Sequence, residues 1–161
     1  MSELQDLEDF FMSVPASPRF TKRSVSIPGD FRTSWRLSVL SLLLAKGRSK
    51  SLALPHLHVL WWAIRTSRSR SLFLKWFEGK KSPDELLVRF DPSLTVAVDL
   101  ALGQGLAERT ATGLIKLTET GSALAESVKN DSSVLVTEKA FLANLPKSIN
   151  QRRIRELLEW T

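Results

Sequence analysis

The sequence of 161 residues contains no cysteine. Disulfides, thiolate nucleophiles and cysteine-based metal sites are therefore excluded, and this composition suits a reducing compartment. Residues 1–11 also lack the basic and apolar regions of a signal peptide. The longest apolar stretches, around Val39–Ala45 and Leu57–Ile64, are far shorter than the ~20 residues that a membrane span requires. We therefore expect a cytoplasmic protein in which these stretches form core helices.

Catalytic and metal-binding motifs are missing as well. His56 and His58 are the only histidines, and side chains two positions apart on a helix point away from each other, so the pair cannot share a metal ion. The loop KGRSK at positions 46–50 lacks the two spaced glycines of a Walker loop, and no hydrolase, zinc-protease or dinucleotide motif occurs. We therefore expect no enzyme activity, no metal and no cofactor. One histidine is expected in the core and the other at a partner-facing edge.

The net charge of +6 is unevenly distributed along the chain. Residues 1–17 contain four acids and no base, residues 18–81 contain fourteen Lys/Arg against two acids, and residues 82–161 contain nine bases against eleven acids. Such asymmetry suggests an acidic or phosphate-bearing partner for the basic segment. A solvated basic surface without a partner is the alternative interpretation.

Apolar spacing and the positions of glycine and proline predict a mainly helical chain. Asp91 and Pro92 form a helix start, with the aspartate as N-cap and the proline in the first turn. Residues 46–51 are predicted to form a polar, basic loop, and Leu86–Phe90 a short strand. The predicted helices are Phe31–Ala45, Pro55–Arg65, Ser69–Phe77, Pro92–Gln104, Val134–Leu145 and Ser148–Trp160.

The segment after Gln104 is the most informative. Two short β-prone runs, 106–109 and 114–117, flank a glycine turn and predict a hairpin. Thr118 then caps a helix whose Leu124 and Val128 return to the core. This order is typical of the second half of a winged helix, although it can also arise in another α+β domain.

The predicted fold class is therefore α+β, mostly α: a winged helix-turn-helix with extra N- and C-terminal helices. We divide the chain into an irregular acidic, proline-containing arm over residues 1–28, a winged-helix domain over 29–130, and a C-terminal helical extension packed on that domain over 131–161.

Winged helices commonly place the helix before the hairpin in the DNA major groove. Here that helix has no Lys or Arg and contains Asp99, and only Gln104 at its end suits base readout. The sequence therefore favours contact with DNA phosphates, without base reading, over major-groove recognition. Candidate backbone-binding residues are Arg32, Arg36, Lys46, Arg48, Lys50, Arg65, Arg68, Arg70, Arg109 and Lys116.

Aromatic and apolar residues supply candidates for protein contact. Adjacent Trp61 and Trp62 cannot face the same way on one helix, so one of them is a candidate interface anchor. The apolar helix before the hairpin also suits protein contact. The candidate partner-interface residues are Phe10, Phe11, Trp62, Leu94, Val98 and Trp160.

The strings LPHLHVLWWAIR and VRFDPSLTVAVDLALGQGLAE followed by GLIKLTETG resemble a known family. They look like the small middle components of three-component ABC-ATPase systems, which include the accessory subunit of Lamassu-type bacterial anti-phage defence. The resemblance covers roughly residues 31–160 and its motifs are mostly structural. It implies a winged-helix subunit beside an SMC-like ATPase and an effector, often a nuclease. It implies sequence-nonspecific contact with double-stranded DNA, and no catalytic residues.

Two other functions fit the same sequence. A stand-alone dimeric winged-helix transcription regulator would bind a palindrome on its own, with the C-terminal helices as its dimerisation element. A regulator or antitoxin paired with a toxin would be a protein binder that the sequence does not separate from the subunit hypothesis.

Overall fold

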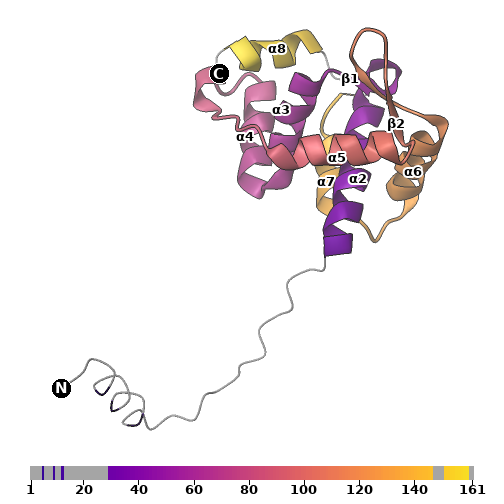
Figure 1. Cartoon of the computed structure of the whole chain (residues 1–161). Coiled ribbons are helices and arrows are strands. Elements are labelled where there is room, and N and C mark those ends of the chain that lie inside the picture. The colour runs from indigo at the N-terminus through magenta and orange to yellow at the C-terminus, as the bar shows by residue number, and fades with distance from the viewer. Residues whose placement is uncertain (1–4, 6–8, 10–11, 13–28, 147–150, 160–161) are drawn as a thin grey trace.

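The computed structural model describes residues 5, 9, 12, 29–146 and 151–159. These residues form a mostly helical fold with one small antiparallel sheet (Figure 1). The α+β, mainly α class is therefore confirmed. In chain order the elements are α2 (Gly29–Lys46), the 3₁₀ turn η1 (Arg48–Lys50), β1 (Ser51–Leu52), α3 (Leu54–Arg65), α4 (Ser67–Phe77), η2 (Pro83–Glu85), α5 (Pro92–Gly103), β2 (Ala107–Arg109), β3 (Ile115–Leu117), α6 (Glu119–Asn130), α7 (Val136–Ala143) and α8 (Gln151–Glu159).

Helix α2 is at the centre of the packing and contacts α3, α5, α6 and the sheet. Its apolar residues recur at helical spacing, so Val39, Leu40, Leu43 and Leu44 are all buried. Helix α3 is apolar nearly all round and buries most of its side chains, as its sequence predicted. None of the helices in the described residues is long and apolar enough to cross a membrane.

A capping box separates α3 from α4. The Thr66 hydroxyl accepts a hydrogen bond from the Ser69 backbone N–H at 3.0 Å, and the Ser69 hydroxyl accepts one from the Thr66 N–H at 3.2 Å. Because Thr66 and Ser69 satisfy each other's backbone N–H groups, α4 begins at Ser67, two residues before the predicted start.

The sheet has the strand order β1-β3-β2. Its first strand was not predicted: Ser51 and Leu52 pair with Lys116 and Ile115 of β3, although the sequence around them favours a loop. Leu52 and Ile115 are buried against the helices. The opposite side of the sheet bears Lys116 and Glu108, which lie directly across from each other in the β2–β3 ladder.

The predicted strand at Leu86–Phe90 is wrong. This segment alternates between buried and exposed side chains, with Leu86 and Val88 inside and Leu87 and Phe90 outside. It nevertheless pairs with no strand of the described sheet, because β1, β2 and β3 bond only to one another. The short, β-prone run on which the prediction rested therefore has two buried side chains without being paired in a sheet.

The hairpin and its flanking helices follow the prediction. Asp91 accepts the Ser93 N–H at 2.8 Å and caps α5. At the base of the hairpin, Thr118 accepts the Gly121 N–H at 3.1 Å and donates its hydroxyl to the Gly105 carbonyl at 2.7 Å. One threonine therefore caps α6 and closes the hairpin.

The C-terminal helices pack on the body, and α7 is shorter than the predicted helix Val134–Leu145. The Trp35 indole N–H donates to the Glu138 carboxylate at 3.3 Å and joins α2 to α7. Helix α8 lies along α3 at the top of Figure 1. The Arg153 guanidinium of α8 stacks over the Phe77 ring of α4 at 4.7 Å.

Candidate functional site: basic residues, the α5 surface and two grooves

The ten predicted phosphate-binding residues do not share one face. Arg32 and Arg36 lie near the start of α2, whereas Lys46 lies at its end, roughly 21 Å further along the helix axis by its rise per residue. A second group, Arg65, Arg68 and Arg70, lies at the corner between α3 and α4. The remaining candidates lie in or beside the sheet: Arg48, Lys50, Arg109 and Lys116. Any DNA contact must therefore use one of these groups and not all ten residues together.

Two arginines at the α3–α4 corner make contacts within the chain. Arg65 forms a salt bridge with Asp91, and Arg70 donates to the Ile64 carbonyl at 2.6 Å at the end of α3. Burial alone would raise the pKa of the Asp91 carboxyl, but hydrogen bonds from Ser93 and the charge of Arg65 outweigh burial and lower that pKa. Arg68 is exposed. This corner therefore uses its charges mainly to join α3 to its neighbours.

Four candidates lie on or beside the sheet, and we call them the sheet-edge cluster: Arg48, Lys50, Lys116 and Arg109. Arg109 pairs with Ile115, so it lies on the opposite face of the sheet from Lys116. The turn η1 contacts β3, so the first two residues approach the strand that contains Lys116. Lys116 lies 3.7 Å from Glu108. The other three are exposed and form no ion pair with any described residue. They are the candidates best placed to bind phosphates.

Leu94 and Val98 were wrongly predicted as interface residues. Leu94 is 0% exposed and Val98 is 1% exposed, because α5 places both on the stripe that packs against the core. The outward side of α5 instead presents Thr95, Val96 and Asp99. With the exposed residues of the preceding segment, this forms what we call the α5 surface: Leu87, Arg89, Phe90, Thr95, Val96 and Asp99.

Of the two adjacent tryptophans, Trp61 is the core residue. Its ring packs edge-on against Trp35 with centroids 5.6 Å apart, whereas Trp62 is only half-buried at the periphery of the core. Trp62 therefore remains an interface candidate. The candidates Phe10, Phe11 and Trp160 lie outside the described residues.

The two histidines occupy different environments. His56 is buried, and His58 is half-buried with its ring stacked on Phe90 at 4.5 Å. Burial lowers the pKa of both imidazoles; the charge of Arg155 adds to this at His56, whereas Asp91 opposes it at His58 without reversing it. Among the described residues, no group of His, Asp or Glu side chains could hold a metal ion.

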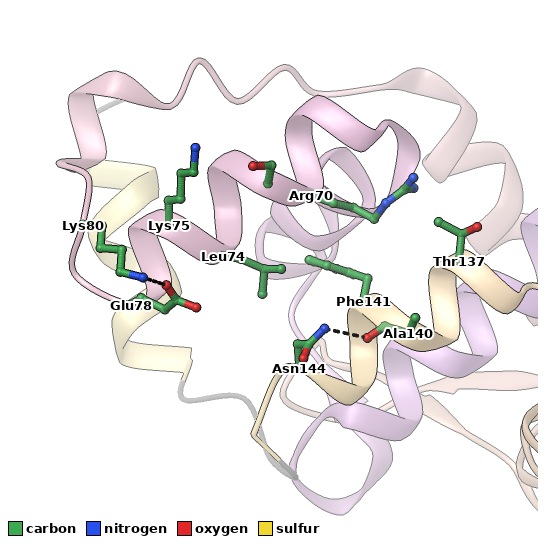
Figure 2. Close-up of a pocket in the computed structure, with 10 residues that line it drawn as sticks. Arg70, Leu74, Lys75, Glu78, Lys80, Thr137, Ala140, Phe141 and Asn144 are labelled. Atoms are coloured by element: carbon green, nitrogen blue, oxygen red, sulfur yellow. Dashed lines mark hydrogen bonds and ion pairs between the residues drawn. The ribbon is translucent and has the colours of Figure 1, made fainter.

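A first groove of about 460 Å³ lies between α4 and α7 (Figure 2). Leu74 and Phe141 point into it from the two helices. Glu78 pairs with Lys80 at 2.6 Å, and Asn144 donates to the Ala140 carbonyl at 3.0 Å. Lys75 extends away from α7.

A second groove, of about 440 Å³, lies among α2, α6 and α7, and we call it the lysine groove. Its apolar lining residues are Leu42, Ala45, Ala125, Leu142 and Ala143, and its charged residues are Lys46, Lys129, Lys139 and Glu126. Sequence reasoning missed this site. Each helix contributes residues three or four positions apart, which is a visible signal, but only packing shows that the three stripes meet.

No protein-family model, curated protein or solved structure matches this chain. Its function is therefore proposed from the arrangement of its own residues and from the resemblance in its sequence.

Proposed function

We propose that this chain is a non-catalytic winged-helix subunit of an SMC-like ABC-ATPase complex of the Lamassu anti-phage type. In this proposal the α5 surface binds the ATPase or the effector. The observation that supports it most directly is the composition of that surface, which has three exposed apolar side chains, one acid and a single base, Arg89. Leu87, Phe90 and Val96 are 67%, 57% and 50% exposed.

The connectivity supports the winged-helix part of the proposal. Helix α2, strand β1, the helices α3 to α5 and the β2–β3 hairpin follow one another in the order of that fold, and β3 lies between β1 and β2. In this interpretation α4 is an additional helix, and α5 occupies the position that reads DNA in winged-helix regulators.

The chemistry of α5 argues against base recognition. Base edges are read by Arg, Lys, Asn or Gln, whereas α5 exposes Thr95, Val96 and Asp99. The Asp99 carboxylate would also be repelled by phosphates. Exposed apolar side chains are better suited to a protein partner, since such side chains form the cores of interfaces.

In this proposal the residues of the sheet-edge cluster contact the DNA. Lysine and arginine near a hairpin bind phosphates without reading sequence, and this binding weakens steeply with salt. A subunit of this kind would help an ATPase complex to hold DNA and would not select a site.

The test is affinity purification of the tagged chain from its native host after nuclease treatment, with mass spectrometry of the co-eluting proteins. We expect a large coiled-coil ATPase in fixed proportion with the wild-type chain, and its loss with Val96→Glu. Val136→Glu is the matched control, because Val136 is similarly exposed, at 58%, and lies in the first turn of α7, where an acid is tolerated.

Two outcomes would overturn the proposal. Recovery of the chain alone as a dimer that binds a palindrome at about 10⁻⁸ M would favour the stand-alone regulator. Retention of the ATPase by the Val96→Glu variant would show that the α5 surface is not the binding surface.

A further inference from the structure

The lysine groove combines an apolar lining with an excess of positive charge. Leu42 and Ala45 of α2, Ala125 of α6 and Leu142 of α7 form part of its apolar lining. Three ammonium groups and a single carboxylate border it. A ligand that fits must therefore be apolar on one side and acidic on the other.

The three lysines are crowded and only partly neutralised. Lys46 donates to the Leu145 carbonyl at 3.5 Å, and Lys139 donates to the Val128 carbonyl at 3.2 Å and to the Asp131 carbonyl. Neither lysine forms a salt bridge with a described residue, although hydrogen bonds from Ser133, helped by the charge of Lys139, lower the pKa of the Asp131 carboxyl. Lys129 lies 3.8 Å from Glu126, with both side chains exposed. Burial, followed by the like charge of Lys129, lowers the pKa of the Lys46 ammonium. A carboxylate bound in the groove would relieve this repulsion.

One segment of the chain has the complementary chemistry. Residues 1–11, MSELQDLEDFF, contain four acids and no base. Their apolar residues, Leu4, Leu7, Phe10 and Phe11, recur every three or four positions, which in a helix places them along one side and leaves acids on the other.

The connection is long enough for this segment to reach the groove. Helix α2 starts at Gly29, and Ala45 at the groove lies about 24 Å further along the helix axis. The seventeen residues 12–28 span up to about 56 Å when extended. The linker therefore exceeds the required distance about twofold.

We propose that residues 1–11 bind in the lysine groove of the same chain as an acidic amphipathic segment. The leucine and phenylalanine side chains contact the apolar lining, and the carboxylates pair with Lys46, Lys129 and Lys139. The α4–α7 groove suits this segment less well, because Glu78 already neutralises Lys80 and Lys75 extends away from α7 (Figure 2). This inference does not depend on the function proposed above.

The absence of cysteine allows a direct test in the full chain. Spin labels are attached at Ser13→Cys, beside the acidic segment, and at Asn130→Cys, an exposed position beside Lys129 at the end of α6. Pulsed electron paramagnetic resonance then measures the distribution of distances between the labels. We expect a narrow distribution, which the additional changes Lys46→Glu and Lys129→Glu convert to a broad one. The matched control, Lys75→Glu with Lys80→Glu in the other groove, leaves it narrow.

Charge exchange distinguishes ion pairing from a general disturbance of the fold. Asp6→Lys and Asp9→Lys are added to the variant that contains Lys46→Glu and Lys129→Glu. If the acidic segment pairs with the groove lysines, these added changes restore the narrow distribution of distances. A broad distribution in the parent chain, or a narrow one that the groove changes leave unaltered, would overturn the proposal. A narrow distribution that disappears on dilution with unlabelled chain would also overturn it, because the segment would then bind another copy.

Discussion

The guanidinium of Arg65, in the last turn of α3, forms a salt bridge with the carboxylate of Asp91, which is the N-cap of α5. The end of one helix is thereby joined to the start of another across the segment that contains η2. Asp91 serves both contacts at once, since its other oxygen accepts the Ser93 N–H.

This double role predicts unequal effects of removing the two partners. Asp91→Ala removes the cap and the ion pair, so we expect the free energy of unfolding to fall by about 1–2 kcal/mol. Arg65→Ala removes only a half-exposed ion pair and should cost less than about 1 kcal/mol. Urea denaturation followed by tryptophan fluorescence measures both. Equal losses in the two variants would show that the cap contributes little.

The two histidines, His56 buried and His58 half-buried, predict that the stability decreases in mild acid. Their pKa values are lowered in the folded chain, so below about pH 6.5 the unfolded chain binds protons that the folded chain resists. The two histidines therefore do not reduce the free energy of unfolding above about pH 6.5, and this free energy falls as the pH is lowered toward 5. Denaturation curves at several pH values give the slope. His56→Gln and His58→Gln should each flatten it, and an unchanged slope in both variants would contradict the prediction.

Two helical glycines, Gly121 buried in the first turn of α6 and Gly103 exposed at the end of α5, should respond in opposite ways to alanine. A Cβ at Gly121 would collide with the Leu106 carbonyl, where α6 meets the hairpin, and would lie 2.9 Å from Leu117 Cδ2. We expect Gly121→Ala to lower the thermal midpoint sharply or to prevent folding. Gly103 has no neighbour near that position, so Gly103→Ala should be neutral or stabilising by up to about 1 kcal/mol. A thermal midpoint of Gly121→Ala at or above that of the wild type would contradict the close packing at this site.

The sheet-edge cluster predicts how DNA binding depends on salt. If the chain acts in the ATPase complex proposed above, Arg48→Glu with Lys50→Glu should weaken the binding of a duplex of arbitrary sequence by that complex. The plot of log affinity against log salt should become shallower by about two, since two phosphate contacts are removed. Fluorescence anisotropy of a labelled duplex measures this slope. Lys75→Glu with Lys80→Glu changes the net charge by the same amount at the α4–α7 groove and should leave the slope unaltered. If the sheet-edge variant retains the wild-type slope, these residues do not contact phosphates.

Local chemistry in the sequence was enough to predict most helices and the hairpin. Asp91 and Thr118 each satisfy backbone donors within three residues, so their roles as caps are readable without tertiary structure. The pairing of Ser51 and Leu52 with β3 was not readable. A two-residue strand has no periodicity, and its identity depends on a partner more than sixty residues away.

The candidate site could be predicted only in part. The sequence did not show which side of α5 faces the core, because the helix is apolar nearly all round. Packing against α2 determines which side is buried. The division of the basic residues into separate groups also follows from packing. Arg65 and Arg70 look like surface charges in the sequence, yet they bind Asp91 and the Ile64 carbonyl.

The tip of the hairpin is closed by its own hydrogen bonds. The Leu114 N–H donates to the Thr110 hydroxyl at 3.0 Å, the Gly113 N–H donates to the Thr110 carbonyl at 2.9 Å, and residues 111–113 are exposed. Thr118 fixes the base of the hairpin independently. Extra residues between Ala111 and Thr112 would replace the exposed turn hydrogen bond between Gly113 and Thr110 and add the slowly growing entropy of a longer loop, while the base of the hairpin stays closed. This makes the tip a suitable insertion point for an epitope or a fluorescent tag, through which the chain could be followed in living cells without altering its core.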